Sequence, residues 1–142
     1  MLKAILLGAA TSVALTYGTL ALDEQVAYRG TEGMWQWLTI VSSPMQTLAS
    51  LLPGFVAGWL AGKRGILAGF LAGVLGNIVY SAVFGTFWDS VLEGGVRSVL
   101  YTILWLCFMA MSWGLYGAAS GATAQLLRSN KALPDNAQNT RA

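Results

Sequence analysis

The segment GFVAGWLAG (residues 54–62) is followed, after Lys63 and Arg64, by GILAGFLAG (residues 65–73), and the two are identical at six of nine positions. A single long helix suits a period of about 11 residues, but it would hold both basic side chains near the bilayer centre at about 2.5 to 3.5 kcal/mol each. A tight turn at Lys63 and Arg64 avoids this cost, because antiparallel helices are joined by about two to five residues. We therefore predict a hairpin of two membrane helices.

The composition places the rest of the chain in a membrane as well. Of its 142 residues, 56% are hydrophobic and only 10% are charged, which is unusual for a soluble domain. A bilayer core of about 30 Å needs roughly 20 apolar residues, and the uncharged runs predict four spans, at about residues 4–22, 44–62, 65–87 and 98–122. We expect an all-α integral membrane protein whose single domain, residues 1–128, is a four-transmembrane-helix bundle. Because the last uncharged run is longer than the bilayer core, its end is expected to project into the cytoplasm.

The positions of the charges predict the orientation, because basic residues near span ends are held on the cytoplasmic side. With four spans, one side of the membrane carries Lys3, Lys63, Arg64, Arg128, Lys131 and Arg141. The other side carries Arg29 and Arg97 with five of the six acids, which are Asp23, Glu24, Glu32, Asp89 and Glu93. We therefore expect a bacterial-type inner (plasma) membrane protein with both termini in the cytoplasm.

Three flanking segments have their own predictions. Residues 1–21 are open to a second interpretation as a signal peptide cleaved near Ala21, although the apolar run is longer than the usual h-region of about 7 to 15 residues. In the first outer loop, apolar residues at helical spacing predict a short interfacial helix at about 33–42. The polar residues 129–142 are expected to form a disordered cytoplasmic tail.

Small residues recur every four positions in the spans, which lets helix backbones approach closely in lipid. The glycines of this zipper-like pattern are Gly54, Gly58, Gly62, Gly65, Gly69, Gly73, Gly85, Gly117 and Gly121. The first interpretation is that these seams hold the bundle together. The alternatives are that part of them forms a homo-oligomer, docks on another membrane subunit or lines a permeation path.

Asn77 is the most informative polar residue, because an amide at mid-depth must find hydrogen-bond partners where there is no water. Folding the hairpin about its turn places Asn77 level with Ser50, and Ser81 level with Gln46. These residues are expected to act as interhelical hydrogen-bond partners. Two alternatives are a polar pocket or pore that also includes Tyr80, and an intermolecular contact of Asn77.

The ionisable residues give no catalytic site. The predicted spans contain no Asp, Glu, Lys, Arg or His, which argues against proton-coupled transport. The chain has no histidine and one cysteine, Cys107, so we expect no metal site, no cofactor and no enzymatic activity. The outer carboxylates are interpreted as solvated charges. A net charge of +2 without a basic stripe predicts no nucleic acid binding.

The leading functional hypothesis is a non-enzymatic membrane protein that acts through helix packing, with the lipid bilayer and other subunits as its partners. It would be an accessory or assembly subunit of a membrane complex, or a self-associating bundle. The first alternative is an oligomeric channel or facilitator for a small uncharged or weakly polar solute. The second alternative is a membrane immunity or holin-like protein.

Overall fold

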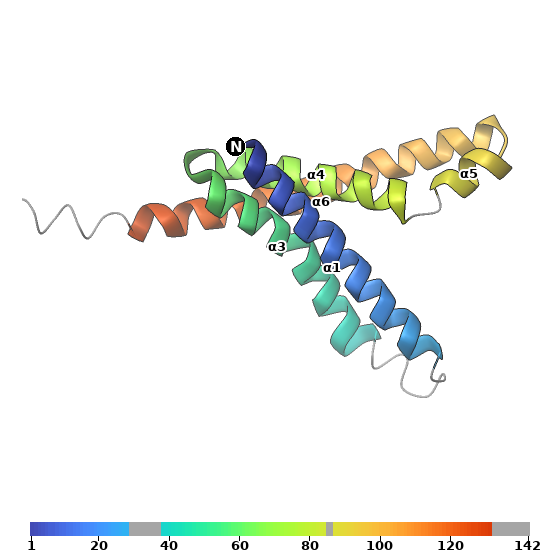
Figure 1. Cartoon of the computed structure of the whole chain (residues 1–142), viewed down its shortest axis with the longest axis horizontal. Helices are drawn as coiled ribbons and strands as arrows, with labels where there is room; N and C mark the ends of the chain where they lie inside the picture. Colours follow the sequence, from blue (N-terminus) through green and yellow to red (C-terminus); the bar gives the residue numbers. More distant parts are fainter. Residues whose placement is uncertain (29–37, 85–86, 132–142) are drawn as a thin grey trace, which may run out of the picture.

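The computed structural model describes residues 1–28, 38–84 and 87–131, and these residues are helical with no strand among them. Figure 1 shows the arrangement. The elements in chain order are α1 (Leu2–Tyr28), the π-helical turn η1 (Leu38–Ser42), α3 (Ser43–Ala61), the 3-10 turn η2 (Gly62–Arg64), α4 (Gly65–Val83), α5 (Phe87–Glu93) and α6 (Val96–Lys131).

Three stretches of the described chain are long and apolar enough to cross a membrane. They are Leu2–Val26, Ile40–Val83 and Val96–Asn130. The central stretch has 44 residues and contains both α3 and α4 with the η2 turn between them. An all-helical protein with several membrane-spanning stretches agrees with the fold class expected from the composition.

The η2 turn reverses the chain at Lys63 and Arg64, where the cost of placing charges in the membrane predicts a turn. Gly62 ends α3 with φ 64° and ψ −113°, and its N–H donates to the carbonyl oxygen of Gly58. Residues with a side chain rarely adopt this conformation, so glycine is required at the turn. Lys63 and Arg64 follow at once and are exposed. The chain then returns as α4 beside α3 (Figure 1).

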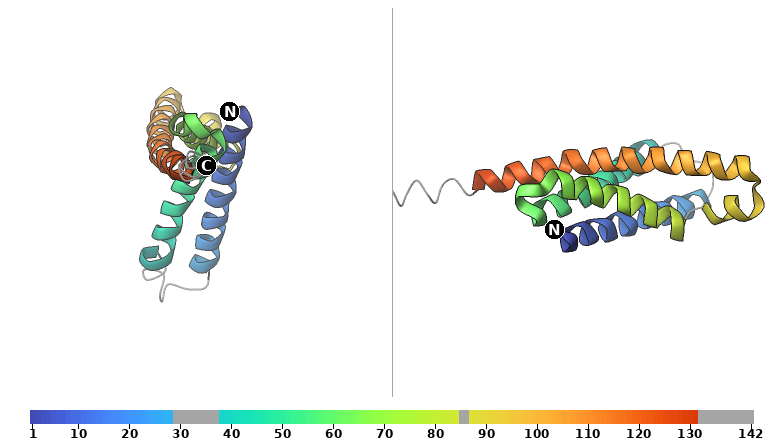
Figure 2. Two further views of the ribbon diagram at one scale, coloured as in Figure 1. Left: turned by 90° about the vertical axis from the view of Figure 1, so that its left-hand side faces the viewer. Right: turned by 90° about the horizontal axis from the view of Figure 1, so that it is seen from above.

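The two outer helices lie on opposite sides of the hairpin. Both α1 and α6 contact α3 and α4, while no Cα atom of α1 comes within 8 Å of one in α6. Away from the η2 turn, α1 stays with α3 and α4 stays with α6, and the two pairs splay apart (Figures 1 and 2).

The centre of the bundle is built from small side chains. Ala57, Ala68, Ala72 and Ala124 are completely buried. Many of the large apolar side chains instead lie on the outside, among them Leu92, Leu104 and Leu115. This distribution suits a bundle in lipid, where close backbone packing holds helices together and the solvent is itself apolar.

Several predicted boundaries change. The third span was expected to reach residue 87, but α4 ends at Val83 and α5 begins at Phe87. The fourth helix continues beyond residue 122 to Lys131, so the start of the predicted disordered tail is helical. Its end is fixed to the hairpin, because the main-chain N–H of Gly65 donates to Gln125 Oε1 at 3.1 Å.

Two predicted segments lie wholly or mostly outside the described residues. The first is the tail, of which residues 132–142 are not described, and the predicted packing residue Gly85 also lies outside the described residues. Of the predicted interfacial helix at 33–42, only Leu38–Ser42 is described, and it forms the π-helical turn that leads directly into α3.

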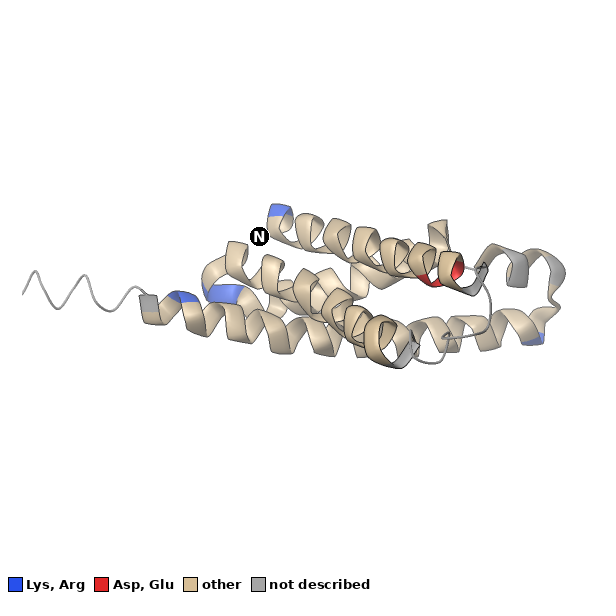
Figure 3. Ribbon diagram, turned by 90° about the horizontal axis from the view of Figure 1, so that it is seen from below, with Lys and Arg blue, Asp and Glu red and all other residues tan. Residues whose placement is uncertain are grey.

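Charged residues of the described chain separate toward the two ends of the molecule (Figure 3). Arg64 Nη1 lies 3.9 Å from Met1 Sδ, and Arg128 Nη1 donates to the carbonyl oxygen of Trp59 at 2.6 Å. The start of α1, the η2 turn and the end of α6 therefore form one basic end. Asp23 lies near the other end of α1, and Arg97 lies in the first turn of α6.

Candidate functional site

The predicted glycine seams lie where α6 meets the hairpin. A Cβ added to Gly58 would come within 2.5 Å of the Gly121 Cα atom, and one added to Gly54 would overlap the Gly117 backbone. On α4, the other helix of the hairpin, a Cβ added to Gly69 would likewise overlap the Gly117 backbone. Gly65 approaches the carbonyl oxygen of Gly121, and Gly73 that of Trp113. These contacts bring three backbones together without intervening side chains.

A second close contact joins α1 to the opposite side of the hairpin. A Cβ on Gly8 would lie 2.8 Å from the Cβ atoms of both Ala57 and Ala72. A Cβ on Gly76 would lie 2.5 Å from that of Ser12. Gly76 and Gly114 were not among the predicted packing residues, because they fall outside the four-residue pattern of their helices.

Gly62 has a different role from the other predicted packing glycines. It forms the turn, and the nearest atom to a Cβ at this position would be Arg128 Nη1 at 3.3 Å. Its conformation, rather than a helix contact, is what requires glycine.

Beyond the glycine contacts, the splayed half of the bundle contains a cavity of about 260 Å³. It lies between α1, α4 and α6, with Phe87 of α5 at its edge. Its polar lining residues are Thr16, Asn77, Tyr80, Ser81 and Thr102. Trp105, Leu106, Met109 and Trp113 of α6 supply its apolar wall. We call this the Asn77 pocket.

Asn77 itself is only 9% exposed, and its Oδ1 atom is buried with no hydrogen-bond partner among the described residues. A buried acceptor without a partner costs about 1 to 3 kcal/mol. Native structures rarely leave such a group unsatisfied. The wall of the Asn77 pocket therefore includes a residue whose buried carbonyl oxygen has no hydrogen-bond donor among the described residues.

The structure brings together only part of the predicted polar cluster. Ser50 Oγ donates within its own helix to the carbonyl oxygen of Thr47 at 2.7 Å. Neither it nor Gln46 lines the Asn77 pocket. The expected Asn77–Ser50 and Ser81–Gln46 hydrogen bonds do not form within the described chain. The reason is the splay: this half of α3 packs on α1 while the same half of α4 packs on α6.

Gln46 belongs instead to a hydrogen-bonded group that joins α1 to α3. Ser42 Oγ donates to Asp23 Oδ2 at 2.7 Å. Gln46 Nε2 lies 3.4 Å from the same carboxylate oxygen and 3.2 Å from Ser42 Oγ. Asp23 was expected to be a solvated charge, and its half-buried carboxylate also accepts hydrogen bonds that link α1 to α3.

Among the described residues, no cluster of His, Cys, Asp or Glu is suitable for holding a metal ion. No family model, curated protein or solved structure matches the chain. Its function must be inferred from the glycine contacts, the splayed helix pairs and the Asn77 pocket.

Proposed function

We propose that the chain crosses a bacterial-type inner membrane four times, with both termini in the cytoplasm. Helices α3 and α4 each have 19 residues, and a helix of this length extends about 28 Å at 1.5 Å per residue. This matches a hydrocarbon core of about 30 Å. Lys63 and Arg64 at the turn, with Lys3 and Arg128 at the same end, support the cytoplasmic position of the turn.

Within that membrane, we propose that the protein is a non-enzymatic accessory or assembly subunit. A transmembrane helix of another subunit would dock between the two splayed helix pairs, over the Asn77 pocket. The observation that carries this proposal is the buried Asn77 Oδ1 atom without a hydrogen-bond partner. On docking, the Asn77 amide would turn from its buried position toward a hydroxyl or amide of the partner helix, which is a common contact between membrane helices.

The glycine contacts support a heterologous partner over self-association through the predicted seams. Gly54, Gly58, Gly69, Gly117 and Gly121 all lie against neighbouring helices of the same chain. They are therefore not free to pack against a second copy. The splayed half offers a partner a surface that these glycine contacts do not use.

The second candidate function is a facilitator for a small, weakly polar solute. It is favoured by the hydroxyl groups of Thr16, Tyr80, Ser81 and Thr102, which line the Asn77 pocket together with the amide. The two candidates differ in what they require of Asn77, because a facilitator needs it for flux and a docking subunit needs it for assembly.

Photo-crosslinking in cells tests the docking proposal. A photoreactive amino acid replaces Thr102, which lines the Asn77 pocket, and in a control chain it replaces Leu104, which is 70% exposed and two residues further along the same helix. We expect an adduct with one other membrane protein from position 102 only. Equal adducts from both positions, or none from position 102, would contradict docking at this pocket. A solute flux that N77L abolishes, with no adduct, would select the facilitator.

A further inference from the structure

The basic end of the molecule contains a second, larger cavity. Its volume is about 750 Å³, and it lies beneath the η2 turn, between the turn and α6. Lys63, Arg64 and Arg128 line it, with Gln125 and Ser129. The lining residues that the structure describes include no carboxylate. We call it the basic cavity.

Arg128 is positioned by a contact with the hairpin. Its Nη1 atom donates to the carbonyl oxygen of Trp59 at 2.6 Å, near the C-terminal end of α3. A guanidinium group has five N–H donors in a planar fork, so donors remain for an anion. No acidic residue of the described chain forms a salt bridge with Lys63, Arg64 or Arg128, and the described carboxylates of Asp23 and Glu24 lie near the far end of α1.

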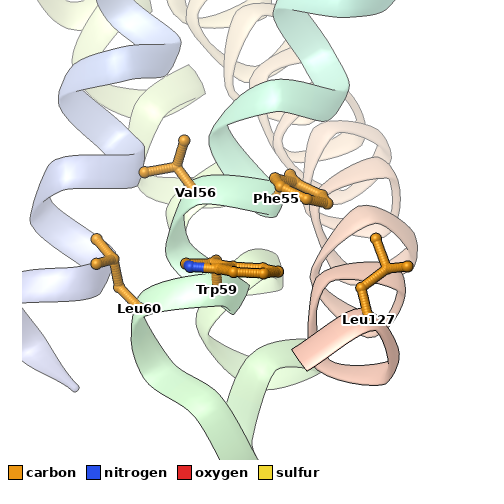
Figure 4. A pocket seen from close by; sticks show the side chains of 5 residues that line it. All are labelled: Phe55, Val56, Trp59, Leu60 and Leu127. Carbon is orange, nitrogen blue, oxygen red and sulfur yellow. The ribbon is translucent and has the colours of Figure 1, made fainter. Parts of the chain in front are cut away.

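An apolar groove adjoins the basic cavity on the α3 side of α6. Its volume is about 580 Å³, and it is lined by Phe55, Val56, Trp59, Leu60 and Leu127. The Phe55 and Trp59 rings stack with their centroids 6.0 Å apart, and Leu127 of α6 lies beside them (Figure 4). Leu60 lines both this groove and the basic cavity, so the two are neighbours along α3.

A second apolar groove adjoins the basic cavity on the α4 side of α6. Its volume is about 470 Å³. Ile66, Leu67, Phe70 and Ala118 form its apolar wall. It shares Lys63, Arg64 and Gln125 with the basic cavity. The basic cavity therefore has an apolar groove next to it on either side of α6, joined to it through Leu60 on the α3 side and through Lys63 and Arg64 on the α4 side.

We propose that this end of the protein binds one anionic phospholipid of the cytoplasmic leaflet. Its phosphate group occupies the basic cavity, and its two acyl chains occupy the two grooves. Arginine forks and lysine ammonium groups match phosphate oxygens, and basic pockets between membrane helices on this side are suited to anionic headgroups. From Leu60 to Phe55 the first groove extends about 8 Å at 1.5 Å per residue, within the roughly 15 Å of one leaflet.

The apolar grooves next to the three cations are what select a lipid over a soluble anion. A free phosphate would use the cations and leave both grooves empty. A zwitterionic lipid would fill the grooves but leave the three positive charges uncompensated. An anionic phospholipid with two acyl chains satisfies both parts of the site.

Native mass spectrometry of the full chain in detergent tests this proposal with phosphatidylglycerol and phosphatidylcholine as probes. The wild-type chain should retain phosphatidylglycerol preferentially. K63Q/R64Q should weaken its binding by roughly ten- to thirty-fold, because the loss of each basic residue is expected to lower the affinity by roughly three- to five-fold. R97Q removes the same kind of charge at the far end of α6 and should bind as the wild type does.

A charge-retaining variant and a competition with inorganic phosphate complete the experiment. K63R/R64K retains both charges and should keep the preference, which separates lost charge from a disturbed turn. Inorganic phosphate at millimolar concentration should not displace the lipid. Equal retention of both lipids, equal loss in R97Q, or displacement by phosphate alone would overturn the proposal.

Discussion

The backbones of Gly69 in α4 and Gly117 in α6 pack so closely that a Cβ atom on either residue would overlap the carbonyl oxygen of the other. Neither carbonyl can move away easily, because each is part of a helix backbone, in α4 and in α6. The contact is therefore a fixed point about which α4 and α6 are placed, and the Asn77 pocket lies further along the same pair.

Gly117→Ala should destabilise the protein although alanine is the better helix former. The added Cβ atom would meet backbone atoms, and overpacking of this kind costs about 1 to 3 kcal/mol. Thermal unfolding in detergent measures the change. Gly18→Ala is the matched control, because a Cβ at Gly18 would meet nothing within 4 Å. It should be neutral or stabilise by up to about 1 kcal/mol. Equal effects of the two substitutions would contradict the contact.

Gly62→Ala should lower stability by about 1 to 3 kcal/mol, because the residue would be held at a φ of 64° that side chains rarely adopt. Gly62→Asn should do the same, since ψ is −113° and lies outside the left-handed region that asparagine tolerates. The same unfolding measurement applies. Gly95→Ala, at a glycine with open space around it, should leave stability unchanged. A fully stable Gly62→Ala protein would mean that the turn has another conformation.

Asp23→Ala should loosen the end of the α1–α3 pair that lies away from the η2 turn. The substitution removes the acceptor of the Ser42 hydroxyl at 2.7 Å, and a lost hydrogen bond to a charged group costs about 1.5 to 3 kcal/mol. Faster amide hydrogen exchange in the first turns of α3 measures the loosening. Glu24→Ala removes the neighbouring, exposed carboxylate and should leave exchange as it is. Unchanged exchange in Asp23→Ala would show that this group does not hold the two helices together.

Asn77→Leu should leave the stability of the isolated chain unchanged or raise it. Asn77 Oδ1 accepts no hydrogen bond from the described residues, and removing an unsatisfied polar atom relieves a cost. If Asn77 instead served as an interhelical hydrogen-bond partner within the bundle, the melting temperature would fall, with a loss of about 0.6 to 2 kcal/mol. Thermal unfolding of the purified variant distinguishes the two.

The parts of this fold that follow from the sequence are those decided by local chemistry. The η2 turn is predictable because two adjacent cations, Lys63 and Arg64, are costly anywhere but at the membrane surface. The packing positions of Gly54, Gly58 and Gly69 follow from their four-residue spacing. The contact at Gly76 does not, because it depends on where α1 crosses the hairpin.

The composition of the Asn77 pocket also depends on tertiary packing. The register of the hairpin puts Ser50 level with Asn77, but register does not decide which helix each half of the hairpin packs against. The first half of α3 packs on α1, and Asn77 faces Thr102 and Trp105 of α6 across the pocket instead. Nothing in the spacing of the aromatic residues of α6 identifies Trp105 as part of the pocket.

Native mass spectrometry of the chain, extracted in mild detergent from the membrane in which it is expressed, tests helix docking at Asn77 most directly. We expect the wild-type chain to carry another membrane protein and the N77L chain, extracted in parallel, to have lost it. A wild-type chain recovered as a lone monomer, or N77L chains that retain the same partner, would contradict the docking of a partner helix over the Asn77 pocket.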